Sequence, residues 1–197
     1  MKLIDLQEKL SELKCFTPLE AKRFLNLPDT TIQKIIYRYT KKGILIKIRN
    51  GLYAFKGRDF PHLWHIANRL YSPSYISFET ALSYYGIIPE TVYTIISATS
   101  KITRNYELQK KEFIYHKIKK NAYTGYKPIK FEGFTVLIAE PEKAIADYLY
   151  ITFLKKLTID ERFRFKNVKK SLLIKYIERY ENEPFIKRAK NVIRKHY

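Results

Sequence analysis

Cysteine is almost absent from this chain of 197 residues: Cys15 stands alone, which excludes an intrachain disulfide and a metal site built from several cysteines. The six glycines are scattered singly, so no glycine-rich phosphate loop or other cofactor motif is present. No run of about 18 apolar residues occurs, which predicts no membrane span. Asp5, Glu8 and Glu12 interrupt any signal-peptide core near the start. These absences favour a protein of the reducing cytoplasm.

Acidic residues are also scarce. Lysine and arginine number 38 against 19 aspartates and glutamates, which gives a formal net charge of +19. Such an excess favours a polyanionic partner, with nucleic acid first and an anionic membrane surface second. The alternative is a soluble lysine-rich protein whose charge serves no particular partner. Hydrophobic residues make up 46% of the chain, enough for a packed core in one large domain or two small ones.

The most informative stretch begins at Thr17. Thr17 to Glu20 form a capping box with proline at the first helical position, which predicts a helix from Pro18 to about Asn26. Pro28 ends this helix, because the residue before a proline disfavours the α region. The residues expected to face inward are Leu19, Ala21, Phe24 and Leu25. An amphipathic helix is predicted upstream from Leu3, Ile4, Leu6, Leu10 and Leu13.

A second, basic helix is predicted from Asp29 to Lys42, with Asp29 as its N-cap and Gly43 as a left-handed C-cap. Its inward stripe consists of Ile32, Ile35, Ile36 and Tyr39. The opposite, exposed face consists of Thr31, Lys34, Arg38 and Lys41, flanked by Thr30, Gln33 and Tyr37.

A β-hairpin is predicted directly after this helix. Residues 44–49 alternate in a strand-like pattern, Leu52 to Phe55 form the return strand, and Asn50-Gly51 is typical of a type I′ turn with positive φ at both residues. Helix, turn, helix and hairpin follow one another in a winged helix-turn-helix, which places one helix in a DNA groove and the hairpin on the backbone. The sequence therefore predicts a winged helix-turn-helix domain over residues 1–57 that binds double-stranded DNA.

The predicted DNA contacts follow from side-chain chemistry. Lys34 and Arg38 suit guanine O6 and N7, and Gln33 suits adenine. Thr30 and Thr31 stand at the helix start, where hydroxyls and backbone N–H groups meet phosphate. The backbone contacts at the helix end and hairpin are predicted for Lys41, Lys42, Lys47, Arg49 and Asn50, with Tyr37 on the same face. The alternative is a helix side that is merely solvated.

The remaining residues, 58–197, are predicted to form an α+β domain with a helical tail. Helices are expected at 61–70 and 78–85, the second capped by Ser77, and an antiparallel sheet at 91–99, 112–117, 127–131 and 134–139. Further helices are expected at 141–154, 159–165, 168–180 and 184–194.

Basic and aromatic residues alternate between Lys101 and Lys130, a pattern that can indicate phosphate contact combined with base stacking. We expect some of the lysines there to contact phosphate. The aromatics Tyr106, Phe113, Tyr115, Tyr123 and Tyr126 are instead expected to pack on the sheet.

A metal-dependent nuclease is the main alternative function, suggested by Glu79, Glu140, Glu142, Lys143 and Asp147. Glu140 and Glu142 are explained by their place at a helix start, and Lys143 with Asp147 by a surface pair at i,i+4. His62 and His65 share a helix face without a third ligand. The sequence thus predicts no enzyme, no catalytic residue and no metal site.

The chain resembles the AbiEi-type antitoxins and transcriptional regulators of abortive-infection systems over nearly its full length. The resemblance rests on the blocks RNGLYAF (49–55), YISFETALSYYGIIPE (75–90), ISATSKITR (96–104) and AEPEKAIADYL (139–149). The chain departs from the family at Lys143-Ala144, where an arginine-threonine pair is common.

The resemblance implies a repressor of its own operon that binds inverted repeats at the promoter. It also implies an antitoxin role against a nucleotidyltransferase-like toxin without a stable complex, with the C-terminal domain linked to antitoxicity and to placement on DNA. Direct binding of the toxin by the helical tail is an alternative. Two copies would read a palindrome as a dimer or as adjacent monomers, which the sequence leaves open.

Overall fold

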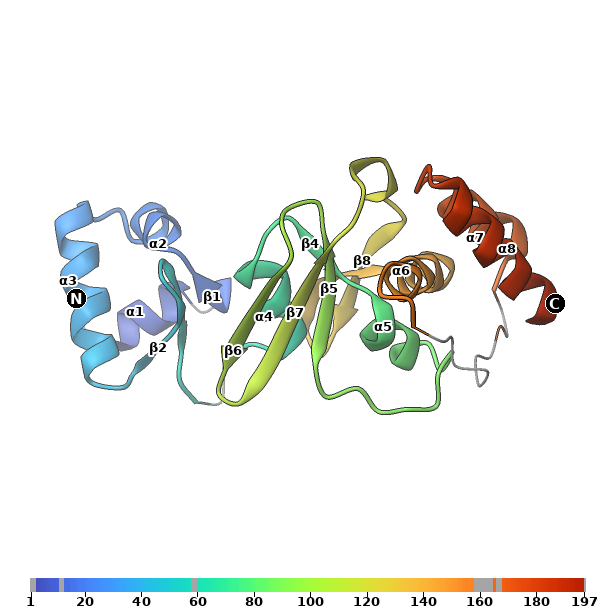
Figure 1. Cartoon of the computed structure of the whole chain (residues 1–197). Helices are drawn as coiled ribbons and strands as arrows, with labels where there is room; N and C mark the ends of the chain where they lie inside the picture. The colour runs from blue at the N-terminus through green and yellow to red at the C-terminus, as the bar shows by residue number, and fades with distance from the viewer. Residues whose placement is uncertain (1–2, 11–12, 58–59, 158–164, 166–167, 197) are drawn as a thin grey trace. The chain divides into compact units, whose positions relative to one another are not determined.

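The computed structural model describes residues 3–10, 13–57, 60–157, 165 and 168–196. The protein is a mixed α+β structure with two sheets (Figure 1). The chain divides into two compact units, Met1–Leu70 and Tyr71–Tyr197, so that the helix over residues 63–70 belongs with the first unit. Within the described residues, no helix has both the length and the apolar character that a membrane crossing requires.

The first unit alternates helices with a small sheet. Its elements in order are α1 (Leu3–Leu10), β1 (Cys15–Phe16), α2 (Pro18–Leu25), α3 (Asp29–Lys41), β2 (Leu45–Arg49), β3 (Leu52–Phe55) and α4 (Leu63–Leu70). The sheet is antiparallel with the strand order β1-β3-β2. The core joins α1, α2 and α3 to this sheet through side chains that include Leu6, Leu25, Ile32, Ile36, Leu45 and Phe55.

The helix ends follow from local chemistry, with two corrections. The predicted capping box is confirmed, since Thr17 Oγ1 accepts from Glu20 N and Glu20 Oε2 accepts from Thr17 N at 2.7 Å. Asp29 is not the N-cap of α3, because Pro28 holds that position and Asp29 instead pairs with Lys22 at 3.0 Å. The prediction that Leu19 and Phe24 face inward was wrong: they are 55% and 47% exposed, because the buried stripe of α2 runs through Ala21 and Leu25.

The end of α3 and the hairpin that follows are set by glycines. Gly43 adopts φ of 68°, with its N–H bonded to Thr40 O and that of Ile44 bonded to Tyr39 O, which closes the helix in a Schellman arrangement. Gly51 has φ of 75°, but Asn50 does not adopt a positive φ. The predicted type I′ turn was therefore wrong, and a register shift between Lys47 and Arg49 accommodates the different turn.

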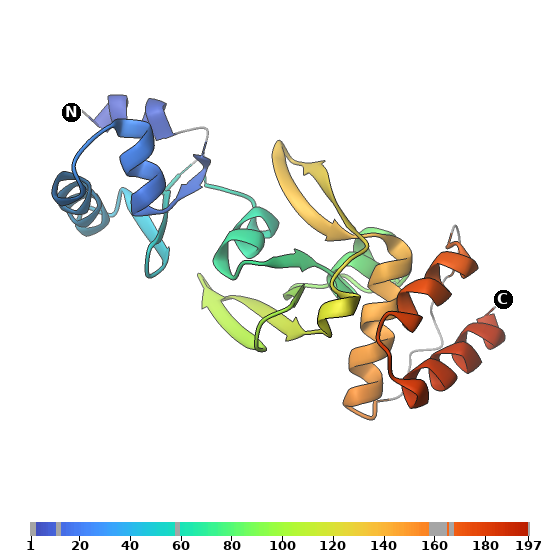
Figure 2. The same cartoon turned by 90° about the horizontal axis from the view of Figure 1, so that it is seen from above.

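The second unit is built on a mixed six-stranded sheet (Figure 2). Its strands are β4 (Ser74–Ile76), β5 (Ile95–Thr99), β6 (Arg104–Leu108), β7 (Lys111–Lys117), β8 (Tyr126–Phe131) and β9 (Phe134–Ala139), in the order β6-β7-β5-β4-β9-β8. Helices α5 (Phe78–Tyr84) and α6 (Pro141–Leu154) pack on one another and on the sheet, and α7 (Lys170–Glu178) and α8 (Glu183–His196) pack against α6. A short 3-10 helix, η2, covers Lys120–Ala122.

The predicted antiparallel sheet was wrong, since β4 pairs with β9 and β5 pairs with β7 in parallel. The strands β4 and β6 were not predicted, and β5 begins at Ile95 rather than at residue 91. Ser77 stands at the N-cap of α5 but makes no side-chain cap bond, because its hydroxyl donates to Asp147. The helix predicted at 159–165 lies outside the described residues apart from its last position, Phe165.

Candidate nucleic-acid interface

One long side of α3 is free of packing and carries most of the predicted DNA contacts. Ile32, Ile35, Ile36 and Tyr39 are buried on its inner side. Thr30, Gln33, Lys34, Tyr37, Arg38, Lys41 and Lys42 are all exposed, and Thr31 is half-buried. Tyr37 is 69% exposed, which is unusual for a large ring in the middle of a helix. The predicted division of this helix into buried and exposed faces is confirmed.

The exposed side of α3 borders the β2–β3 hairpin. A groove of about 230 Å³ between them is lined by Gln33, Ile36, Tyr37, Thr40, Lys47 and Tyr53. Thr40 Oγ1 is shielded from solvent and has no hydrogen-bond partner among the described residues. The groove thus combines an exposed ring, an amide, a hydroxyl and an ammonium group in one place.

Three groove residues, Ile36, Thr40 and Tyr53, were not among the predicted contacts, and of these Ile36 belongs to the predicted inward stripe. Tyr53 could have been found from the alternation of the return strand, which places it on the face opposite the buried Leu52 and Ala54. Arg38 follows Tyr37 by about 100° around the helix axis, which turns it away from the groove. Its guanidinium carbon lies 5.0 Å from the ring centroid of Tyr39.

The hairpin carries Lys47, Arg49 and Asn50, all exposed. Arg49 Nε donates to the carbonyl oxygen of Leu70 at 2.9 Å, and its Nη1 donates to that of Asn50 at 2.8 Å. These bonds fasten the hairpin to the end of α4 and leave part of the guanidinium for other acceptors. Arg49 is therefore both a fixed support of the hairpin and a cation on its surface.

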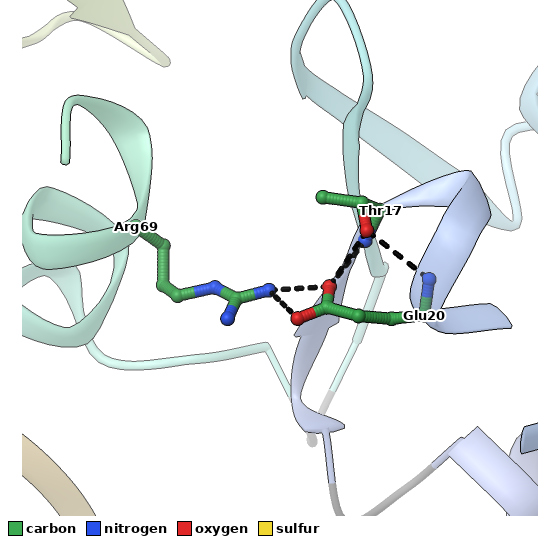
Figure 3. A network of polar contacts seen from close by, with 3 residues as sticks. All are labelled: Thr17, Glu20 and Arg69. Carbon is green, nitrogen blue, oxygen red and sulfur yellow. Dashed lines mark hydrogen bonds and ion pairs between the residues drawn. The ribbon is translucent and has the colours of Figure 1, made fainter. Parts of the chain in front are cut away.

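A second arginine fastens α4 to the start of α2 (Figure 3). Arg69 Nη2 donates to the carboxylate oxygens of Glu20 at 2.7 and 2.5 Å, and Glu20 completes the capping box with Thr17. Burial raises the pKa of Glu20, but the hydrogen bonds from Arg69 and Thr17 outweigh it and hold this pKa below its ordinary value. This charged, paired carboxylate therefore ties the start of α2 to α4.

The electrostatics of this surface have one sign. No aspartate or glutamate occurs between Thr30 and Gly57, whereas this stretch holds Lys34, Arg38, Lys41, Lys42, Lys47, Arg49 and Lys56. The nearest acid, Asp29, is paired with Lys22. A surface of this kind attracts polyanions, and its attraction weakens as salt screens the charges.

In the second unit, the basic residues between Lys101 and Lys130 are all exposed. Several have intramolecular partners: Lys101 donates to Ser72 O at 2.7 Å and Lys119 to Glu181 O at 2.9 Å. Phe113 and Tyr115 are wholly buried, and the ring of Tyr126 stacks on Tyr75 at 4.5 Å. The prediction that the aromatics of this segment pack on the sheet is confirmed.

Three of the carboxylates considered for a nuclease, Glu140, Glu142 and Asp147, accept hydrogen bonds within the second unit. Lys143 and Asp147 form an ion pair with both side chains fully buried, so the predicted surface pair was wrong. Asp147 also accepts hydrogen bonds from Tyr75, Ser77 and Tyr180, which enclose both of its oxygens. A carboxylate with all its acceptor positions occupied inside the core is not accessible to a substrate.

Glu140 and Glu142 serve the same packing. Glu140 accepts from the hydroxyl of Tyr176 at 2.6 Å, and Glu142 accepts from the backbone N–H of Lys169 at 2.8 Å. His62 Nδ1 accepts from Trp64 N at 3.1 Å. In the part of the chain that the structure describes, no three His, Cys, Asp or Glu side chains are grouped to hold a metal ion.

Comparison with models of known protein families and with curated protein sequences finds no match to this chain.

Proposed function

We propose that the first unit is a winged helix-turn-helix that binds double-stranded DNA, with α3 as the recognition helix and the β2–β3 hairpin as the wing. The order helix, strand, helix, helix, strand, strand supports this, with the short β1 completing the sheet of the wing. The observation that carries the proposal is the acid-free, exposed face that α3 and the hairpin form together.

In this proposal α3 enters the major groove, which is wide enough for one helix. Gln33 and Tyr37 read base edges, Gln33 through the N6 and N7 groups of adenine and Tyr37 through its hydroxyl or against a thymine methyl. Lys34 and Arg38 lie one turn apart on the neighbouring face of α3, where both suit guanine at the flank of the site. Thr30 and Thr31 meet phosphate at the helix start.

The backbone contacts come from both ends of α3 and from the wing. Lys41 and Lys42 hold phosphates beside the end of α3, and Lys47, Arg49 and Asn50 hold the neighbouring backbone. Thr40 supplies a hydroxyl at the floor of the groove between them. Exposed lysines of the second unit add a sequence-independent attraction to the same polyanion.

The biological role follows from the resemblance to AbiEi-type regulators. We propose a cytoplasmic repressor that binds inverted repeats in its own promoter and acts as the antitoxin of a nucleotidyltransferase-like toxin. Neutralisation without a stable complex is the scheme that the resemblance implies. A gene for such a toxin beside this one would support the role, and its absence would leave only the DNA-binding proposal.

A binding titration on DNA tests the interface. The full chain is titrated onto its upstream promoter DNA and onto a scrambled duplex of equal length, at several salt concentrations. Tyr37→Ala should weaken promoter binding by about 1–3 kcal/mol and affect the scrambled duplex much less, because a base contact carries sequence information. Lys34→Ala should weaken binding to both duplexes, and more strongly to the promoter.

The matched control is Lys9→Ala, which removes one exposed lysine from α1, outside the interface. It should reduce binding to both duplexes slightly and equally. If Tyr37→Ala and Lys34→Ala bind the promoter as Lys9→Ala does, α3 is not the recognition helix. Incubating the parent protein and plasmid with Mg²⁺ or Mn²⁺ checks the alternative: nicking would favour a nuclease, and protection without nicking favours a repressor.

A further inference from the structure

The two edges of the large sheet differ in whether they can accept another strand. Sheet order places β6 at one edge and β8 at the other. An edge strand presents backbone N–H and C=O groups on its outer side, and these groups pair readily with a further strand unless the edge is blocked.

The β8 edge is blocked. Pro128 sits in the middle of β8 and has no N–H to donate, and the exposed side chains on either side of it, Lys127 and Lys130, carry the same charge. Proline and lysine are the two residues most often used to prevent pairing at an edge. A second copy of β8 brought alongside would place like charges close to one another.

The β6 edge has none of these features. Its five residues, Arg104, Asn105, Tyr106, Glu107 and Leu108, all retain a backbone N–H and include charges of both signs. Among the strands that the structure describes, β7 is its one neighbour. A shallow depression of about 530 Å³ adjoins it, lined by Asn105, Tyr106, Glu107, Lys110 and Glu112. The edge is therefore open, and its surroundings mix donors with acceptors.

We propose that β6 is a self-association edge, at which β6 of a second copy of this chain pairs antiparallel and joins the two sheets. Two-fold symmetry restricts the register of this strand pair. Residues directly opposite one another point to the same face of the sheet, and side chains alternate between faces along a strand, so the axis must pass between a residue and its own counterpart. The register centred on Tyr106 uses all five residues. It sets Tyr106 opposite its counterpart and Asn105 opposite Glu107 twice, and an amide donor meets a carboxylate acceptor at both places.

Self-association at β6 does not depend on the proposed DNA binding, and salt should affect the two in opposite directions. Each copy carries a net charge of +19, so added salt weakens the repulsion between copies. Salt weakens DNA binding instead, because phosphate contacts release counterions. A five-residue strand pair is also small compared with a stable dimer interface, so the association should be weak and concentration-dependent.

Disulfide crosslinking tests the register directly. The native Cys15 is fully buried, so an added cysteine reports alone. Tyr106→Cys should give roughly tenfold more oxidised dimer than Asn105→Cys, because directly opposite Cα atoms lie about 4.5–5.5 Å apart and residues offset by two positions lie beyond disulfide reach. An equimolar mixture of Asn105→Cys and Glu107→Cys should crosslink well, and each alone should crosslink poorly.

The mixed experiment guards against loss of folding at Tyr106, whose ring lies 5.8 Å from that of Tyr115. The mixed Asn105 and Glu107 experiment replaces exposed side chains only. In the Tyr106→Cys background, Glu107→Lys should lower crosslinking several-fold, and Glu183→Lys, the same charge change at the exposed start of α8, should lower it much less. Equal crosslinking at residues 105, 106 and 107 would overturn the proposal. So would crosslinking at Tyr106→Cys that does not increase as salt is added.

Discussion

Helices α3 and α6 contain similar residues in opposite surroundings. Each carries lysine and tyrosine along its length, with Lys34 and Tyr37 in α3 and Lys143 and Tyr150 in α6. Those of α3 are exposed, whereas Lys143 is wholly buried and Tyr150 stacks on Tyr180 at 4.1 Å. Residue type alone therefore does not distinguish an exposed helix face from a polar core, and the other residues of each helix decide which of the two it forms.

The deciding difference is the distribution of apolar residues around the helix. In α3 they form a single stripe that meets the core, so the remaining side chains must face water. In α6 they occur on every side, and the helix lies between the sheet and the helices α7 and α8. A helix that is apolar all round is buried, and any charge on it needs a buried partner. Asp147 is that partner for Lys143.

The largest effect is expected from breaking the buried pair. Lys143→Met should lower the free energy of unfolding by about 3–5 kcal/mol, because it leaves the Asp147 carboxylate charged inside the core without its cation. Burial lowers the pKa of the Lys143 ammonium, and the attraction of Asp147 offsets only part of this lowering. Urea denaturation followed by circular dichroism measures the change.

The matched control is Lys34→Met on α3, which makes the same substitution on an exposed face. It should change the free energy of unfolding by less than about 0.5 kcal/mol, as is usual for surface positions. If Lys143→Met and Lys34→Met unfold at the same urea concentration, the contrast between the two helices fails.

The α3 side of this contrast could be predicted from the sequence. Capping box, glycine C-cap and apolar stripe located α2 and α3, because these signals depend on nearest neighbours along the chain. The burial of the Lys143–Asp147 pair was missed because the residues that enclose it lie far from it in sequence: Tyr75 and Ser77 donate to Asp147, and Tyr180 accepts from Lys143. The two-residue strand β1 was missed for a similar reason, since it exists only through pairing with β3. The apolar residues on every side of α6 were the sequence signal that could have predicted the burial of Lys143.

An intermediate effect is expected at His116, which is half-buried and so lies between the two extremes. Burial, together with the nearby Lys155, lowers the pKa of this histidine to about 4, and its ring meets Phe78 edge-on at 5.2 Å. The folded state then binds fewer protons than the unfolded state between pH 6.5 and 4, so stability falls as the pH falls through this window. His116→Gln should reduce the loss between pH 7 and pH 5 by about 1 kcal/mol, after allowance for solvent screening.

Chemical denaturation of parent and variant at both pH values gives this difference, and the other histidines cancel because both proteins keep them. If His116→Gln loses stability on acidification as steeply as the parent, the ring is protonated in the folded protein. Partial burial would then not be enough to shift the pKa of a side chain such as His116.

The smallest effect on folding is expected at the exposed extreme, Lys47 on the hairpin. Lys47→Ala removes a solvated cation, so the urea midpoint should stay within experimental error. In the proposed complex this lysine contacts a phosphate, and its loss should lower the slope of log binding constant against log salt by about 0.9 for duplex DNA. Promoter and scrambled duplex should be affected alike, because a phosphate contact carries no sequence information. An unchanged slope would show that the hairpin does not contact DNA, even if the exposed face of α3 does.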